Sequence, residues 1–461
     1  MRYISTRGEA PEATFKEAML TGLARDGGLY LPAEIPTLST RQIAGMAGQS
    51  YEEVAFQVIS PFIGDTFTGA ELRTLIERAY ASFSHPARAP LVQIGPKDWV
   101  LELHHGPTLA FKDFAMQLIG QMFDAELSRQ GKRITIVVAT SGDTGSAAVE
   151  AFAGRDNVDC FVLYPHGRIS EVQRRQMTTP GAANVHALAV EGDFDACQAQ
   201  VKAMFNHFEF RDEVGLAAVN SINWARVMAQ IVYYFTAATS LGAPRREIDF
   251  SVPTGNFGDI YAGHIARRMG LSVGRLVIAT NENDILHRTL TTGAYRREGV
   301  TPTIAPSMDI QISSNFERLL FELYDGDAAA VRQSMSDLAH GGGFELSQGV
   351  QSRLREGFAS GRSDAGQTSA MIARIVGEGG PLLDPHTAIG VVAAEACRGE
   401  NPMVTLGTAH AAKFPDAVEA ASGQRPKLPA RMGDLYDRAE RLTIVPNDLT
   451  ALEATIRERR P

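Results

Sequence analysis

The strongest constraint on the fold is a short run of β-branched and apolar residues at 134–139, which reads ITIVVA. A strand of this composition is typical of a parallel sheet that is covered on both faces. Comparable runs recur downstream, separated by segments with helical spacing, at 160–164, 185–190, 248–252, 275–279 and 403–406. Such alternation predicts parallel sheets connected by crossover helices. We therefore expect an α/β fold with two lobes, over about 134–220 and about 248–410, and a cleft between them.

The first 98 residues lack this alternation. Residues 27–32 predict a turn and a short strand, and residues 51–59 and 69–76 have helical spacing. A chain of 461 residues is also too long for one ordinary core. We therefore expect a mostly helical N-terminal accessory domain, a first and smaller α/β lobe, and a larger α/β lobe, with bounds at 1–98, 99–232 and 233–461. Loops are expected at the glycine run 341–343 and the polar stretch 361–369.

Composition excludes several classes of function. The net charge of −9 argues against a surface for nucleic acid or anionic membranes. Three widely spaced cysteines are typical of a reducing compartment and offer no metal-binding pattern. The N-terminal segment has no apolar signal core, and no run approaches the ~18 apolar residues of a spanning helix. We expect a cytoplasmic protein that binds a small molecule and no metal, as a monomer or a homodimer.

Lys112 begins a segment that is apolar on two helical faces. One face carries Phe111, Phe114, Leu118 and Met122, and the face of Lys112 itself carries Met116, Ile119 and Phe123. A helix that is apolar on two sides is buried, so Lys112 is predicted to point into the interior. Burial lowers the pKa of the amine and makes it a usable nucleophile or base. The alternative is a surface lysine that extends past an apolar patch.

Two of the expected strands run into glycine-containing turns that precede helices. The turns are residues 140–146, TSGDTGS, before a helix expected from Ala147, and residues 253–259, PTGNFGD. Backbone N–H groups at a helix N-terminus bind anions; the first turn suits a carboxylate and the second a phosphate. Asp259 is expected to turn its side chain away and cap a helix or turn. Either turn alone is also compatible with an ordinary connection between a strand and a helix.

Several common binding and catalytic motifs are absent from the sequence. Neither turn matches G-x-G-x-x-G or a P-loop, and the chain has no G-x-S-x-G and no H-E-x-x-H. A buried lysine with a carboxylate site and a phosphate site at strand ends is instead typical of a pyridoxal phosphate enzyme. The hypothesis that follows is an α/β enzyme that uses this cofactor.

Specific segments carry a resemblance to a known family. Residues 105–114, HGPTLAFKDF, resemble the cofactor-lysine segment of threonine synthases, residues 141–145 their substrate loop, and residues 255–259 their cofactor-phosphate loop. Further similar segments, typical of the longer microbial and fungal branch, lie at 2–36, 220–226, 313–318, 384–390 and 407–414. The resemblance covers nearly the whole chain. One departure is Ala411, where the family often has proline.

The resemblance implies the fold of the tryptophan-synthase-β group and a role for each matching position. Lys112 would bind the cofactor covalently, Thr408 would face its pyridine nitrogen, and Asp143 would lie near its 3-hydroxyl. The cofactor phosphate would lie on Gly255, Asn256, Phe257, Gly258 and Asp259. The substrate carboxylate would lie on Ser141 and Thr144. Candidates for the substrate phosphate are Ser313, Ser314, Asn315 and Arg318, followed by His105 and Lys413.

The implied reaction converts O-phospho-L-homoserine and water to L-threonine and phosphate, with Lys112 moving protons at Cα and Cβ. Two alternatives stay open from the sequence. The first is a threonine-synthase-like phospholyase that eliminates phosphate without adding water. The second is a non-catalytic paralogue that binds pyridoxal phosphate or an amino acid as a sensor.

Overall fold

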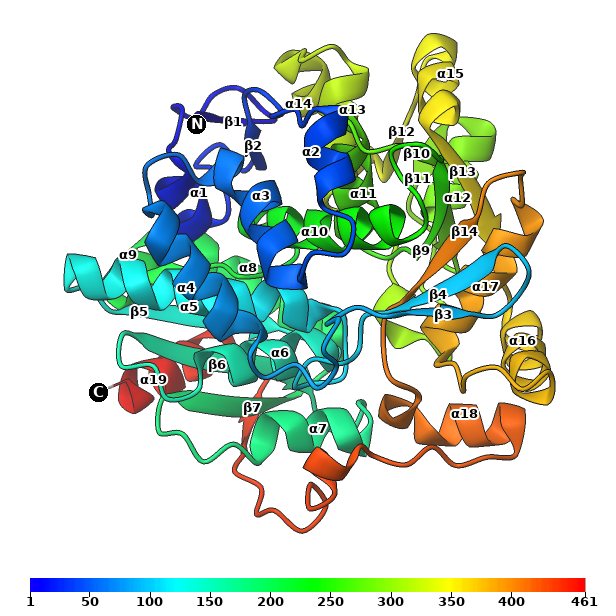
Figure 1. Cartoon of the computed structure of the whole chain (residues 1–461). Helices are drawn as coiled ribbons and strands as arrows, with labels where there is room; N and C mark the ends of the chain where they lie inside the picture. Colours follow the sequence, from blue (N-terminus) through cyan, green and yellow to red (C-terminus); the bar gives the residue numbers. More distant parts are fainter. Residues whose placement is uncertain (461) are drawn as a thin grey trace.

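Two sheets form the framework of the molecule (Figure 1), which we describe over residues 1–460 from a computed structural model. The smaller sheet is wholly parallel, with the strand order β15-β7-β6-β5-β8. Its strands are β5 (Ile134–Ala139), β6 (Val158–Pro165), β7 (Val185–Glu191), β8 (Leu216–Ala217) and β15 (Thr443–Pro446). Strands β5 and β6 are buried along almost their whole length, as expected for a sheet covered on both faces.

The larger sheet has the order β13-β10-β9-β14-β4-β3, and only β3 is antiparallel to its neighbour. Its strands are β3 (Leu91–Gln93), β4 (Asp98–Glu102), β9 (Ile248–Pro253), β10 (Val273–Thr280), β13 (Phe358–Arg362) and β14 (Met403–Gly407). All six buried runs that the sequence pattern identified lie within strands of these two sheets. The predicted two-lobed α/β fold is therefore confirmed.

Helices from both halves of the chain fill the space between and around the sheets. Helix α10 (Trp224–Ser240) is buried along nearly all of its length and crosses the middle of the molecule in Figure 1. It packs against α3 (Tyr51–Ile63), α5 (Lys112–Gln130) and α11 (Gly258–Arg268). The helices that follow the strand ends near the interior are α5 (Lys112–Gln130), α6 (Asp143–Phe152), α11 (Gly258–Arg268) and α17 (Pro385–Ala396).

The remaining elements surround this core. In the smaller lobe they are α7 (Glu171–Thr178), α8 (Phe194–Asn206), α9 (Phe208–Val214) and α19 (Leu449–Arg459). In the larger lobe they are α12 (Ile285–Thr292), β11 (Ala294–Arg296), η1 (Pro306–Met308), α13 (Phe316–Leu323), α14 (Ala328–Gly341), β12 (Gly343–Glu345), α15 (Gln348–Gly357), α16 (Ala365–Gly377), η2 (Ala411–Lys413) and α18 (Pro415–Ser422). A short turn, η3 (Ala430–Met432), lies in the connection to β15.

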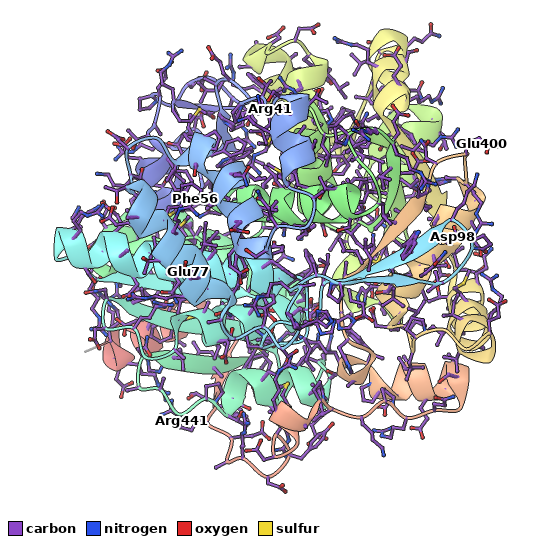
Figure 2. The ribbon with its side chains drawn as sticks, viewed as in Figure 1. Arg41, Phe56, Glu77, Asp98, Glu400 and Arg441 are labelled. Carbon is purple, nitrogen blue, oxygen red and sulfur yellow. The ribbon has the colours of Figure 1, made fainter. Side chains whose placement is uncertain are left out.

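The N-terminal region packs on this framework as a small hairpin and four helices. The hairpin pairs β1 (Tyr3–Ser5) with β2 (Tyr30–Pro32), and the helices are α1 (Phe15–Thr21), α2 (Thr40–Gly45), α3 (Tyr51–Ile63) and α4 (Gly69–Tyr80). A serine or threonine N-cap with glutamate or glutamine three residues into the helix starts all four, a capping box that satisfies free N–H groups. Figure 2 marks Arg41 on α2 and Glu77 on α4, both exposed, on the outer side.

Two expected loops are wrong. Gly341 ends helix α14 and Gly343 begins strand β12, which pairs with β11. Within 361–369, the first two residues belong to β13 and the rest mostly to α16. The polar residues there form a capping box, in which Asp364 accepts from the N–H of Gln367 at 2.8 Å. Polarity in this stretch therefore reflects a helix start rather than a loop.

The chain crosses between the two sheets three times, so the sheets do not follow linear domain bounds. Strand β4, at the predicted boundary near residue 98, joins the larger sheet, and β15 near the C-terminus joins the smaller one. The C-terminal connection is held by Arg441 (labelled in Figure 2), whose side chain donates to the carbonyl of Ala182 at 2.6 Å. The division at 1–98, 99–232 and 233–461 stays a proposal, and three strands depart from it: β3 and β4 lie in the larger sheet and β15 lies in the smaller one. No helix within residues 1–460 is long and apolar enough to cross a membrane.

Candidate active site

A cavity of about 640 Å³ lies between the lobes, where strands β5, β9 and β14 end. The carboxyl ends of parallel strands are the usual place for ligands in α/β proteins. The N-terminal region also reaches the cavity through Arg7, Leu23 and Gly27. The predicted site residues that line it are Lys112, Ser141, Asp143, Thr144, Gly255, Asn256, Phe257, Gly258, Asp259, Ser314 and Thr408.

Lys112 is the first residue of α5, and its side chain is buried, with 11% of its surface exposed. The residues on its face of the helix, Met116, Ile119 and Phe123, are all fully buried. Burial lowers the pKa of the Lys112 amine, and the positive charges of Lys413 and Arg226 act in the same direction. The structure therefore places at the cavity an amine that loses its proton more readily than an exposed lysine.

Asp143 lies directly against Lys112, with 3.2 Å between its Oδ2 atom and Nζ. Its other oxygen, Oδ1, accepts from Nζ of Lys413 at 2.8 Å and from Nε2 of Gln173 at 2.9 Å. The hydroxyl of Ser307 donates to Oδ2 at 3.3 Å. Although burial by itself raises the pKa of the Asp143 carboxyl, the two ammonium groups hold it well below its usual value. A buried carboxylate thus stands ionised between two lysines.

The turn before Asp143 is tighter than the sequence indicated. Helix α6 begins at Asp143 and not at Ala147. The reason is Thr140, whose Oγ1 accepts from the N–H groups of Gly142 and Gly145, each at 2.9 Å. Gly142 has φ +130, and a Cβ there would lie 2.3 Å from the side chain of Gln173, so only glycine fits. The early start places Thr144 in the first helical turn, beside the cavity, with Ser141 just before it.

The loop 255–259 presents a helix N-terminus to the cavity. Phe257 has left-handed backbone geometry, φ +62, immediately before α11 begins at Gly258. Asn315 supports the loop from behind, because its Nδ2 donates to the carbonyl of Asn256 at 2.9 Å. A Cβ at Gly255 would lie 2.8 Å from the Ser307 carbonyl, so glycine is required there as well. The loop can bind an anion through backbone N–H groups.

Asp259 turns away from the loop as expected, but it does not cap a helix or turn. Its Oδ1 accepts from the hydroxyls of Tyr233 and Tyr234, at 2.6 and 3.0 Å. Burial raises the pKa of this carboxyl to about 7. Its side chain therefore fixes α11 against α10 and leaves its backbone N–H as the part that faces an anion.

Thr408 lies on the cavity wall, and its backbone is fixed by two hydrogen bonds. It follows β14, its carbonyl accepts from the N–H of Phe111 at 2.9 Å, and its own N–H donates to Oγ1 of Thr387 at 3.2 Å. Its hydroxyl makes no hydrogen bond to any other residue in 1–460. A free hydroxyl on the cavity wall is available to a ring nitrogen.

The structure separates the predicted residues for the substrate phosphate. Ser314 lines the cavity, but Ser313, Asn315, Arg318 and His105 do not. Ser313 donates to the Gly255 carbonyl. His105 Nε2 lies 2.7 Å from Oε2 of Glu102, outside the cavity wall. The interpretation of these residues as direct ligands is therefore not supported by the geometry.

Arg318 supports the site from behind the wall. Its guanidinium is fully buried and donates to the carbonyls of Tyr30 and Ile222, at 2.8 and 2.6 Å, and to Oδ1 of Asn315. All of its nitrogens point to these protein oxygens because burial leaves an arginine no water to bind. Arg318 thereby joins the N-terminal hairpin to the residue that holds the phosphate loop.

Sequence reasoning missed a second buried arginine, Arg226. It lines the cavity and is only 3% exposed, and its side chain makes one hydrogen bond within the described residues, from Nη1 to the carbonyl of Val219 at 3.2 Å. Its Nε is buried without a partner among the described residues, and burial lowers its pKa to about 10. The sequence signal was present in NSINWAR at 220–226, where an arginine interrupts the start of an apolar helix. Asn220 and Ser221 also line the cavity.

His386 was missed too. It lines the cavity, its Nδ1 lies 2.9 Å from Oδ1 of Asp384, and its Nε2 accepts from the N–H of Ser307 at 3.2 Å. Both ring nitrogens are therefore occupied, and His386 positions residue 307 near Asp143. Within residues 1–460, no group of histidine, cysteine and acidic side chains is arranged to hold a metal ion.

These residues fit pyridoxal phosphate. The cavity combines the buried amine of Lys112, whose pKa is lowered, with the loop 255–259, whose glycines leave the backbone N–H groups accessible. The free hydroxyl of Thr408 is available to the ring nitrogen. The fold and the site together define a pyridoxal-phosphate-dependent enzyme with two α/β lobes.

Comparisons with known proteins agree and identify the family. Three family models match in chain order: "Threonine synthase N terminus" over residues 2–80, "Pyridoxal-phosphate dependent enzyme" over 85–340 and "Threonine synthase, C-terminal" over 387–456. The chain is 52% identical over 459 residues to threonine synthase of Pseudomonas aeruginosa, covering 99% of this chain and 98% of that protein.

Solved structures support the same assignment. The pyridoxal-phosphate-bound threonine synthase of Brucella melitensis is 56% identical, with a TM-score of 0.97 and coverage of 100% of this chain and 99% of that one. Yeast threonine synthase is 40% identical, with a TM-score of 0.93 and coverage of 99% and 98%. The chain belongs to the threonine synthase family.

Replacing Gly258 by valine tests the phosphate loop. A Cβ at Gly258 would lie 3.3 Å from Nδ2 of Asn315, the group that holds the Asn256 carbonyl. We expect the affinity for pyridoxal phosphate, measured by fluorescence titration, to fall about tenfold or more while the fold survives, because the disturbance is local. Gly349→Val is the matched control, since Gly349 also lies in the first turn of a helix but has open space around it. Equal affinity in the two variants would move the phosphate site elsewhere.

Proposed function

We propose that the chain converts O-phospho-L-homoserine and water to L-threonine and phosphate, the last step of threonine biosynthesis. The observation that carries this proposal is the buried amine of Lys112, 3.2 Å from an ionised Asp143 and beside a cavity lined by the N-termini of α6 and α11. We also propose a cytoplasmic enzyme, a monomer or a homodimer, without a nucleic-acid partner. The net charge of −9 supports the last point.

Bound pyridoxal phosphate supplies an electron-withdrawing ring that stabilises negative charge on the carbons of the substrate. Lys112 contributes the proton transfers: its neutral amine takes the Cα proton, gives that proton up to the conjugated system of cofactor and substrate, and, neutral again, takes a Cβ proton. The Cγ–O bond breaks, and phosphate leaves with the bonding electrons. Water then adds its oxygen at Cβ, protons return to the carbon chain, and threonine is released. Proton transfer by a positioned side chain contributes about 10²–10⁴ in rate.

The substrate carboxylate is proposed to lie at the start of α6. Ser141 and Thr144 line the cavity there, on either side of Gly142 and Asp143. The helix N-terminus attracts negative charge and the two hydroxyls donate hydrogen bonds. Asp143 itself repels a second carboxylate, so the substrate carboxylate would stay on the side of the hydroxyls.

The substrate phosphate is proposed to lie on Arg226, in place of Arg318. Arg226 has an unpaired buried nitrogen at the cavity, whereas Arg318 is saturated by carbonyl groups behind the wall. Asn220, Ser221 and Ser314 line the same cavity and supply neutral donors. A phosphate would neutralise the buried guanidinium and make charge-assisted hydrogen bonds with it.

Product analysis tests the reaction and separates it from the alternatives. With O-phospho-L-homoserine as substrate in ¹⁸O-water, we expect threonine that carries one ¹⁸O at Cβ, with one phosphate released per threonine. Formation of 2-oxobutyrate in place of threonine would favour the phospholyase. A cofactor absorbance that never shifts on adding substrate would favour the sensor.

Two buried arginines provide a matched test of the phosphate assignment. Arg226→Met should raise KM for the phosphorylated substrate by at least about tenfold, because a charge-assisted contact is lost, and should leave thermal unfolding nearly unchanged. Arg318→Met should instead lower the free energy of unfolding by about 3 kcal/mol or more, because the Tyr30 and Ile222 carbonyls lose their buried donor. Steady-state kinetics and chemical denaturation measure the two effects. The reverse pattern would restore Arg318 as the phosphate ligand.

Replacing Lys112 tests its double role. Lys112→Ala leaves the loop 255–259 and Thr408 intact, so noncovalent cofactor binding should persist, weakened. Turnover should fall by at least about 10⁴, because the general base and the covalent attachment are both lost. Lys112→Arg should not restore turnover, since a guanidinium stays protonated. An alanine variant that keeps more than about a tenth of the wild-type turnover would make Lys112 a packing residue only.

A further inference from the structure

Lys413 has a position that the reaction as described does not use. It is the last residue of the short turn η2, just beyond Thr408, and its side chain is completely buried. Its Nζ donates to the Thr108 carbonyl and to Oδ1 of Asp143, both at 2.8 Å. A buried ammonium is costly unless it is paired, so this lysine is held in one place from two directions.

Asp143 is therefore shared by two lysines that come from distant parts of the chain. Lys112 binds Oδ2 and Lys413 binds Oδ1. Two ammonium nitrogens on opposite oxygens of one carboxylate lie within about 8 Å of each other, a range over which buried charges interact strongly. The charged and titratable groups around this carboxylate are Lys112 and Asp113 on α5, Lys413 on η2, Arg226 on α10 and His386 on α17.

The sharing matters because a base must be neutral before it accepts a proton. A buried carboxylate paired with Lys112 alone would hold its ammonium form, which cannot act as a base. Lys413 competes for the same carboxylate and places a second positive charge nearby. Burial lowers the pKa of Lys112, and the negative charge of Asp143 raises it. The positive charges of Lys413 and Arg226 lower it again. Lys413 thus offsets the effect that Asp143 has on Lys112.

We propose that Lys413 is a positioning residue for the proposed reaction. By binding the second oxygen of Asp143, it keeps this carboxylate from holding Lys112 in its protonated form. Lys112 can then accept a proton from the substrate. The proposal rests on the proposed function of Lys112. It also explains how a carboxylate is tolerated directly beside the reactive amine. The hydrogen bond to Thr108 fixes Lys413 on the segment that leads into Lys112.

Competitive acetylation of the full chain, purified without cofactor, tests this directly. Trace acetic anhydride reacts only with the neutral amine, and mass spectrometry of the Lys112 peptide from about pH 6 to about pH 10 gives the midpoint of its titration. In Lys413→Met we expect this midpoint at least about one pH unit above wild type, so that the reactive fraction at neutral pH falls about tenfold. Lys413→Arg, which keeps the charge, should retain the wild-type midpoint. The pH at which kcat/KM of the holoenzyme falls on the acid side of its pH profile should shift in the same direction as the labelling midpoint.

We expect Lys413→Met to fold, because Gln173 still donates to Asp143 and Gln176 still donates to the Thr108 carbonyl. If it nevertheless fails to fold, Lys413→Gln replaces it, because glutamine removes the charge and keeps a hydrogen-bond donor. The same rise of the Lys112 midpoint is expected in that variant, since the Asp143 carboxylate is again left to Lys112. An unchanged midpoint in folded protein, or an equal shift in Lys413→Arg and Lys413→Met, would overturn the proposal. Labelling needs no substrate, so a failure of the proposed reaction would be seen separately, in the product analysis.

Discussion

The ionised carboxylate of Asp143 is the interaction on which the rest of the site depends. It lies on α6 of the smaller lobe and accepts from Lys112 at the start of α5, while Lys413 and Ser307 reach it from the larger lobe. Its contacts therefore connect residues of the two lobes at the cavity. A buried ion pair of this kind contributes little net stability, because desolvation offsets the attraction. Its value lies in fixing the amine and its protonation state at one place in the cavity.

A second layer of contacts holds the phosphate loop in shape. Asn315 donates to the carbonyl of Asn256, and Arg318 connects Asn315 to the carbonyl of Tyr30 in the N-terminal hairpin. Glu317, on the same helix, binds Arg7 at 3.1 Å. The accessory region is thereby part of the support of the site, since its backbone saturates an arginine that would otherwise compete for anions. Precise placement of backbone N–H groups depends on such supporting contacts.

Much of the fold was predictable because buried parallel strands have a distinctive composition, as the run at 134–139 shows. Lys112 was predictable because apolar residues on two helical faces leave its side chain only the interior. Arg318 and Arg226 could not be told apart from sequence, since both lie beside polar residues at helix starts. Only their partners distinguish them: Arg318 meets three protein oxygens and Arg226 one. The partnership of Lys413 with Asp143 joins residues 270 positions apart, beyond the reach of any local pattern.

The most direct test of the site is to find where the cofactor is attached. The holoenzyme should absorb near about 410–420 nm, as expected when pyridoxal phosphate is bound to a lysine amine, and borohydride should abolish this band. Digestion and mass spectrometry of the reduced protein should then place the pyridoxyl group on the peptide that contains Lys112. Attachment to Lys413, or the absence of any covalent adduct in folded, cofactor-saturated protein, would contradict the assignment of Lys112.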